Sequence, residues 1–190
     1  MITINLYGGP GSGKSTIAAG LFSRLKLSGI NAELVTEYAK DKAWESPPVE
    51  DKNGVIKFAP IFDNQIYIFA KQHHRLWRLN GQVDIAITDS PLLLSAVYND
   101  GKFPSLDKFI IETYHGFNNL NYFLNRTKKY NPSGRNQNEE QAKLIDIKIK
   151  DMLKDTVPFI ELDGNESAII TIANKILDTL NTNVSPDWNN

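Results

Sequence analysis

The stretch ITINLYGGPGSGKST, residues 2–16, decides the fold. Its first half is a short apolar run, and its second half has four glycines between positions 8 and 13. Glycine loses more conformational freedom on folding than any other residue, so this cluster indicates that the backbone approaches something closely. Gly8, four further residues and then Gly13-Lys14-Ser15 complete the pattern G-x-x-x-x-G-K-[ST], which follows a strand and opens a helix. The stretch therefore predicts a loop that holds the phosphates of a nucleotide.

Each part of this loop has a predicted role toward ATP and Mg²⁺. The backbone N–H groups of such a loop point at the phosphates, and the positive end of the following helix dipole favours anions. Lys14 is expected to reach the β- and γ-phosphates, and the Ser15 hydroxyl is expected to bind Mg²⁺. The predicted nucleotide-binding residues are Gly8, Gly9, Pro10, Gly11, Ser12, Gly13, Lys14, Ser15 and Thr16. The alternative is a glycine-rich turn with an incidental lysine.

Strand-like and helix-like segments alternate along the chain, as they do around parallel α/β sheets. The predicted strands are 2–6, 32–38, 83–89, 120–125 and 158–162, and the predicted helices are 14–28, 61–81, 139–153 and 167–180. The segment 41–54, rich in proline and charge, is predicted to be a loop. We therefore predict an α/β fold of the P-loop NTPase type. It is a three-layer sandwich whose five-stranded, mainly parallel sheet is flanked by helices and a short basic lid.

Length and composition indicate one domain, residues 1–181, with a lid at about 126–142 and a polar tail at 182–190. The chain of 190 residues has no cysteine, which excludes disulfides and cysteine-based zinc sites and agrees with a cytoplasmic protein. The N-terminus lacks the basic segment of a signal peptide. No apolar stretch approaches the ~18 residues of a membrane span, so we expect no membrane association.

Two carboxylates follow predicted strands at the edge where ligands bind. Asp89 ends the apolar strand 83–89, and Glu37 stands near the end of the strand 32–38. In open α/β sheets, ligands bind outside the carboxyl ends of the strands, so both side chains are expected to face the nucleotide. Asp89 would bind Mg²⁺ with Ser15 or orient an acceptor, and Glu37 would accept a proton from a hydroxyl. The alternatives are a helix N-cap for Asp89 and an exposed acid for Glu37.

Basic side chains gather in the segment RTKKYNPSGRNQ, residues 126–137. Phosphoryl transfer spreads negative charge over the equatorial oxygens, and positioned cations are worth about 10³–10⁵ in rate. A loop that closes over the site would supply such cations and exclude water. We predict a basic lid in which Arg126 and Arg135 are catalytic cations, accompanied by Lys128 and Lys129. The alternative is a solvated basic loop.

The predicted helix 61–81 carries several polar side chains. Its glutamine and asparagine side chains could read the hydrogen-bonding edge of a base, with Tyr67 or Phe69 stacking on that base. The alternative is a half-exposed helix with a polar face. His73 and His74 are adjacent and point about 100° apart on a helix, which argues against a shared metal site.

The motifs together resemble those of the nucleoside and nucleotide kinases. They are the complete P-loop, VTEYAK (35–40), ITDSPLL (87–93) and RTKKYNPSGRNQNEEQA (126–142). The set is most similar to that of phage-encoded P-loop kinases related to thymidylate kinase and to ribosylnicotinamide-kinase domains. The resemblance covers residues 1–180 and implies ATP, Mg²⁺ and transfer of the γ-phosphoryl group to a nucleoside- or nucleotide-type acceptor.

The resemblance also suggests roles for individual residues. By position, Glu37 is similar to the acid that follows the second strand of deoxynucleoside kinases, and Asp89 to the acid of their DRS motif. Ser90 stands where that family has arginine. The resemblance therefore requires Arg126 or Arg135 to take over the charge of that arginine.

The acceptor and the class of activity stay open at this point. One phage branch of the thymidylate-kinase-like group phosphorylates 5-hydroxymethyluracil within DNA, where the base must be flipped out or single-stranded. A net charge of −1 gives no sign of the basic face of tight DNA binders and favours a small acceptor. A P-loop ATPase or switch is the third class, although Asp89 lacks the adjacent glutamate with which many ATPases activate water. A homodimer is compatible with the sequence, as is the host cytoplasm if the protein is viral.

Overall fold

The computed structural model describes residues 1–54, 56–127 and 138–182. Its centre is a five-stranded sheet in which every neighbouring pair of strands is parallel. In spatial order the strands are β2 (Ala32–Val35), β5 (Ile85–Thr88), β1 (Ile2–Tyr7), β6 (Asn118–Asn125) and β7 (Ile160–Asp163). The predicted α/β class and five-stranded parallel sheet are therefore confirmed.

Parts of two predicted features lie outside the described residues. They are residues 128–137 of the lid and residues 183–190 of the tail. Within the described ranges, no helix combines the length and the apolar character needed to cross a membrane.

The strand order places the phosphate-binding loop at the middle of the sheet. β1 lies between β5 and β6, with Ile4 in register with Ile87 on one side and Leu120 on the other. The chain first moves from β1 to β2 at one edge, and later adds β6 and β7 on the opposite side of β1. Such a reversal is the switch point at which open α/β sheets bind ligands. The loop after β1 stands at that point.

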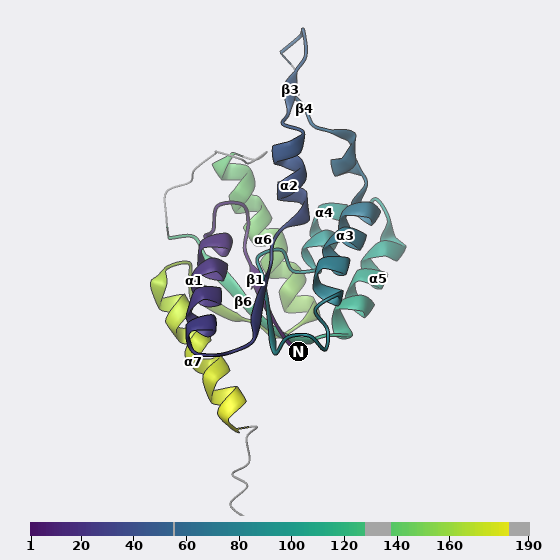
Figure 1. Ribbon diagram of the computed structural model, residues 1–190. Helices are drawn as coiled ribbons and strands as arrows, with labels where there is room; N and C mark the ends of the chain where they lie inside the picture. The colour runs from purple at the N-terminus through teal and green to yellow at the C-terminus, as the bar shows by residue number, and fades with distance from the viewer. Residues whose placement is uncertain (55, 128–137, 183–190) are drawn as a thin grey trace, which may run out of the picture.

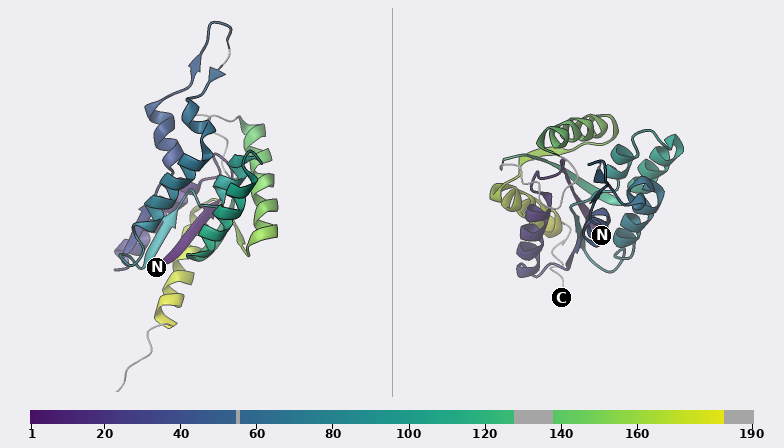
Figure 2. Two further views of the ribbon diagram at one scale, coloured as in Figure 1. Left: turned by 90° about the vertical axis from the view of Figure 1, so that its right-hand side faces the viewer. Right: turned by 90° about the horizontal axis from the view of Figure 1, so that it is seen from above.

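Helices cover both faces of the sheet, which confirms the three-layer arrangement (Figure 1; Figure 2). One face is covered by α1 (Lys14–Leu27) and α7 (Glu166–Thr182). The other face is covered by α3 (Gln65–Trp77), α4 (Leu94–Asn99), α5 (Pro104–His115) and α6 (Glu139–Thr156).

Each face of the sheet has its own buried core, because successive strand residues point to opposite faces. In β1, Ile4 packs into the core beneath α1 and α7, whereas Tyr7 belongs to the core beneath α3 to α6. Asn5 is almost fully buried, and its amide donates to Asn119 Oδ1 (2.9 Å) and Asn121 Oδ1 (3.1 Å) of β6. These bonds tie β1 to β6 just before the phosphate-binding loop begins.

The prediction of a loop at 41–54 is wrong for residues 41–45, which are helical, and for residues 49–50, which form a strand. α2 (Tyr38–Glu45) begins soon after β2, and β3 (Val49–Glu50) pairs with β4 (Ile56–Lys57) in an antiparallel hairpin. Lysine, alanine and glutamate are good helix formers, so the charged residues extend a helix rather than a loop. Pro47-Pro48 follow the end of that helix. The hairpin projects beyond the body of the protein (Figure 1; Figure 2).

Other boundaries differ from the predicted ones for local reasons. The predicted helix 61–81 begins with a 3₁₀ turn, η1 (Pro60–Asp63), because Asn64 caps α3 by accepting a hydrogen bond from Tyr67 N. The predicted strand 32–38 ends at Val35, since Tyr38 already belongs to α2. α4 and α5 occupy a region for which no element was predicted.

Gly164, directly after β7, lies where the phosphate-binding loop meets the end of β6. Its N–H donates to Asn125 O (2.9 Å). A Cβ at this position would lie 2.4 Å from Ser12 O and 3.0 Å from Asn125 O, and both oxygens belong to the backbone. Only glycine allows the three segments to approach so closely.

We expect Gly164→Ala to lower the free energy of unfolding by about 1–3 kcal/mol, the usual cost of overpacking an interior. Urea denaturation followed by circular dichroism measures the change. Gly116→Ala is the matched control, because Gly116 has φ −71° and ψ −5°, and its added Cβ would lie 3.2 Å from Thr113 O. This contact is longer than those at Gly164, so the control should lose clearly less free energy of unfolding than Gly164→Ala. Equal losses in the two variants would contradict the requirement for glycine at 164.

Candidate active site

Each of the four glycines in the phosphate-binding loop has a structural reason, which is either its φ value or a lack of space for a side chain. Gly8, Gly11 and Gly13 have φ values of 139°, 79° and 100°, which residues with side chains rarely adopt. Gly9 is needed for space instead, because a Cβ there would lie 2.6 Å from Ala142 O of α6. Gly13 is also the N-cap of α1, so the first N–H groups of that helix lie beside the loop. This is the arrangement that binds phosphate at a helix N-terminus.

Lys14, the first residue of α1, folds back across the loop. Its Nζ donates to Gly8 O (2.6 Å) and Gly9 O (3.1 Å). Burial lowers the pKa of Lys14, and three nearby carboxylates oppose that effect. The three carboxylates belong to Glu37, Asp89 and Asp146. The structure thus brings the predicted Lys14, Glu37 and Asp89 together and adds an acid that was not predicted.

Asp89 follows β5 and pairs with Ser15. Its Oδ2 accepts a hydrogen bond from Ser15 Oγ (2.6 Å), and its side chain is buried. Among the described residues, no hydrogen-bond donor reaches its buried Oδ1. α4 begins at Leu94 with Leu93 as its N-cap, so the alternative role of Asp89 as a helix cap is wrong. A hydroxyl beside a carboxylate with one unbonded oxygen fits Mg²⁺, which prefers oxygen ligands.

Glu37 occupies the turn between β2 and α2. It is the N-cap of α2, with φ −66° and ψ 120°, but its side chain makes no capping hydrogen bond. The carboxylate instead lines a cavity that also contains Lys14. Burial raises the pKa of Glu37, Lys14 lowers it, and Asp89 raises it again. A partly buried carboxylate with a raised pKa is suited to proton transfer.

Arg126 packs against the phosphate-binding loop and forms hydrogen bonds there. Its Nη1 donates to Pro10 O (2.7 Å), and its Nη2 donates to Asp146 Oδ2 (2.9 Å). The other carboxylate oxygen of Asp146 accepts a hydrogen bond from Gly9 N. The side chains of Arg126 and Asp146 are only 11% and 19% exposed. The structure therefore places Arg126 in the support of the loop, while Arg135, the other predicted catalytic cation, lies outside the described residues.

Asp146 is a site residue that sequence reasoning missed. It lies on α6, on the helix face that also presents Ala142, Ile149 and Leu153, and all three of these are fully buried. A carboxylate within a buried helix face is uncommon unless it has a polar partner, and that position was the available signal. The partner itself lies on the distant loop and could not be identified from the spacing.

A cavity of about 520 Å³ extends from the phosphate-binding loop to α2, α3 and α4. Pockets for small molecules commonly have this size. Aromatic walls come from Trp44 of α2, Phe62 of η1 and Tyr98 of α4. The polar lining residues away from the loop are Glu37, Lys40, Gln65, Gln72, Ser90 and Ser95. The cavity wall is therefore mixed, with polar and apolar residues in similar number.

Some predicted base contacts are absent from this cavity. Phe69 is buried in the core, and the Tyr38 hydroxyl donates to that of Tyr67 (3.2 Å); neither Phe69 nor Tyr67 is among the residues that line the cavity. Phe69 is therefore not available to stack on a base in this cavity, and the aromatic residues that line it are Trp44, Phe62 and Tyr98. The stacking role of Tyr67 stays a prediction.

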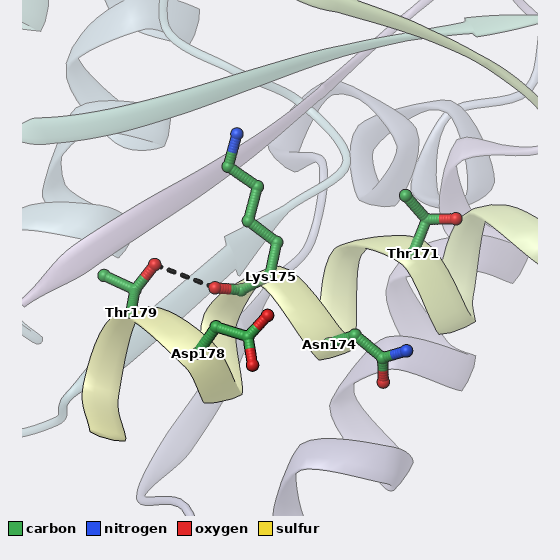
Figure 3. A pocket seen from close by; sticks show the side chains of 5 residues that line it. All are labelled: Thr171, Asn174, Lys175, Asp178 and Thr179. Atoms are coloured by element: carbon green, nitrogen blue, oxygen red, sulfur yellow. Dashed lines mark hydrogen bonds between the residues drawn. The ribbon is translucent and has the colours of Figure 1, made fainter. Parts of the chain in front are cut away.

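A second hollow runs along α7 (Figure 3). Its lining residues are Thr171, Asn174, Lys175, Asp178 and Thr179, all from one helix. Thr179 Oγ1 donates to Lys175 O (2.8 Å), which is an ordinary bond within the helix. This hollow contains none of the predicted site residues.

We expect Asp146→Asn to lower the free energy of unfolding by about 1–3 kcal/mol, because one amide oxygen cannot replace two carboxylate acceptors in a largely buried site. It should also weaken ATP binding, since the loop loses a fixed acceptor for Gly9 N. Urea denaturation and calorimetric titration with ATP measure the two effects. Asp151→Asn is the matched control on the same helix, because Asp151 pairs with Lys154 where both side chains are 62% exposed. A similar ATP affinity in both variants would show that Asp146 does not shape the loop.

The chain is similar to one family of known proteins and to a solved structure. A search of curated proteins finds no match. One similar solved structure is the deoxyadenosine kinase from M. mycoides with the products dCMP and a flexible dCDP bound. The two chains are 17% identical over 95% of this chain and 98% of that chain, with a TM-score of 0.48. A profile of the AAA-domain family matches residues 3–168, a range that contains the whole phosphate-binding loop. Because this match spans most of the chain, the protein belongs to the AAA-domain family.

Proposed function

We propose that the protein is an ATP-dependent kinase that transfers the γ-phosphoryl group to a hydroxyl of a nucleoside-type acceptor. The observation that carries the proposal is the position of Glu37. Its carboxylate lines the same cavity as Lys14 and Ser15 of the phosphate-binding loop. A carboxylate at the phosphate end of a cavity is suited to accept a proton from an attacking hydroxyl.

The donor half of the site is the phosphate-binding loop. The loop and the N-terminus of α1 would hold the triphosphate, and Lys14 would neutralise charge that grows as the phosphoryl group moves. Ser15 and Asp89 would hold Mg²⁺, which supplies further charge neutralisation on the phosphate oxygens when bound. Support for this set comes from the short Ser15–Asp89 hydrogen bond and the unbonded Oδ1 of Asp89.

The acceptor half of the site favours a neutral hydroxyl over a phosphate. The acceptor oxygen would form a bond to the γ-phosphorus while the bond from that phosphorus to the β–γ bridging oxygen breaks, so that ADP leaves. A hydroxyl must lose its proton in this step, and Glu37 would take it. The phosphate of a nucleoside monophosphate needs no base to remove a proton. Its negative charge would be repelled by the Glu37 carboxylate. Among the described residues that line the cavity, Lys14 and Lys40 are the cations.

The remaining cavity walls suit a nucleoside. Trp44, Phe62 and Tyr98 offer aromatic faces and edges to a base, and Gln65 and Ser95 offer polar groups. A base is flat and apolar on its faces but polar at its edge, so it matches this mixture of walls.

Phosphate transfer from labelled ATP tests the proposal. The acceptor panel contains free nucleosides, nucleoside monophosphates, DNA that contains 5-hydroxymethyluracil, and water alone. We expect transfer to at least one nucleoside and none above background with Lys14→Ala. Transfer only to monophosphates would overturn the hydroxyl preference, and transfer only to the modified DNA would assign a DNA kinase. ATP hydrolysis without transfer to any acceptor would assign an ATPase.

We expect Glu37→Gln to lower kcat by about 10²–10⁴-fold, the range that general bases contribute, with little change in ATP affinity. Burial raises the pKa of Glu37. Activity of the native enzyme should therefore fall as the pH drops through a value above the ordinary ~4.3 of glutamate, and this acid limb should vanish in the variant.

Glu45→Gln is the matched control for this prediction, because Glu45 lies on the exposed side of α2, where it pairs with Lys42. It should keep the native kcat and the native pH profile. Full kcat in Glu37→Gln at every pH would reject Glu37 as the base, while the acceptor panel would still decide whether the protein is a kinase.

A further inference from the structure

Gln72 of α3 holds the backbone on both sides of Glu37. Its Oε1 accepts a hydrogen bond from Tyr38 N (2.9 Å), and its Nε2 donates to Thr36 O (3.3 Å). The side chain is only 4% exposed. One amide group therefore binds the residue before Glu37 and the residue after it.

This turn needs an external support because it lies beyond the regular hydrogen bonds of the sheet. β2 ends at Val35 and α2 starts at Tyr38, so Glu37 stands in the connection between them. The Glu37 side chain makes no capping bond that would fix it from within. Its direction is therefore set by the backbone of the turn, and that backbone is bound by Gln72.

A second side chain of α3 strengthens the same support. Arg75, one helical turn after Gln72, donates from Nη1 to Thr36 O (3.1 Å) and Thr36 Oγ1 (3.2 Å). Its Nη2 donates to Asp41 Oδ2 (2.5 Å), in the first turn of α2. α3 thus binds the turn and the helix that follows it as one unit.

The chemistry of the contact selects glutamine. The turn presents one N–H donor and one carbonyl acceptor, and one side-chain amide can form hydrogen bonds with both. A glutamate of the same shape accepts from Tyr38 N but offers no donor to Thr36 O when ionised. A methionine of similar size offers neither group.

We propose that Gln72 is a positioning residue that aims the Glu37 carboxylate at the acceptor hydroxyl, an inference that rests on the proposed function. Gln72 also lines the cavity, so direct contact with the acceptor is the competing role. Direct contact would act mainly on the KM of the acceptor, whereas positioning of a base acts on kcat.

Gln72→Met tests the proposal first. We expect kcat to fall by about 10- to 100-fold, because a base displaced by about 1 Å loses that much rate. The KM of the acceptor and the affinity for ATP should change little. In a Glu37→Gln background the same substitution should cause no further loss of kcat, because the base on which Gln72 acts is already gone.

Gln72→Glu is the second variant, and it keeps the size of the side chain while removing the donor to Thr36 O. It adds a negative charge beside the turn, so the pKa of Glu37 should rise further and the acid limb of activity should move to higher pH. The charged and titratable groups that already face Glu37 are Lys14 of α1, Asp89 after β5, Lys40 and Asp41 of α2, and Tyr98 of α4.

Lys71→Met is the matched control. Lys71 precedes Gln72 on α3, is exposed, and its Nζ lies 5.3 Å from the centre of the Tyr67 ring. It should leave kcat, the KM of the acceptor and the pH profile of kcat in place.

The combined outcomes separate the two ideas. Full kcat in Glu37→Gln would mean that Glu37 is not the base, which is a failure of the proposed function. A normal kcat in Gln72→Met, or an equal loss of kcat in the native and Glu37→Gln backgrounds, would overturn the positioning role alone. A native kcat on the plateau above the acid limb in Gln72→Glu would also overturn it.

Discussion

The rest of the structure depends on how closely α6 and the turn after β7 pack against the phosphate-binding loop. α6 approaches so closely that Gly9 has no room for a side chain, and the turn after β7 approaches Ser12 so closely that Gly164 has none either. Arg126 and Asp146 add hydrogen bonds to Pro10 O and Gly9 N of the loop. The loop can therefore meet a ligand only from the side of the cavity. A shift of α6 would move the loop with it, because interiors packed at this density transmit displacement.

Three parts of the site are each held by a distant part of the chain: Asp89, the phosphate-binding loop and the turn with Glu37. Asp89 is bound by Ser15, the loop is bound by Asp146 of α6, and the turn with Glu37 is bound by Gln72 of α3. None of these supports is local in sequence. In the proposed reaction this geometry would be preorganised by the fold, so substitutions in the supporting helices would reduce the rate without touching a substrate.

The sequence predicted the features that are local and missed those that arise from packing. The loop at 8–16 is one continuous motif, and the strand before Asp89 is a nearly continuous apolar run, so both could be found by inspection. Asp146 could not, since its partner lies far away in sequence and only the docking of α6 brings them together. The segment 41–54 was misassigned because proline and charge suggested a loop, although its first residues favour a helix. Phe69 was one candidate for stacking on a base, and its burial in the core depends on how α3 packs on the sheet, which the sequence spacing does not show.

Charge balance explains why the proposed reaction needs cations beyond those described. Around the loop, Lys14 and Arg126 stand against the carboxylates of Glu37, Asp89 and Asp146. A triphosphate adds several negative charges, and like charges near a protein surface repel by roughly 4 kcal/mol at 4 Å. Mg²⁺ at Ser15 and Asp89 would offset part of this repulsion, and residues 128–137 contain three further cations in sequence. A bound triphosphate would raise the pKa of Glu37 further, and Mg²⁺ or other cations beside the triphosphate would lower that pKa again. Cations at the donor would therefore act on the proposed base as well as on the phosphates.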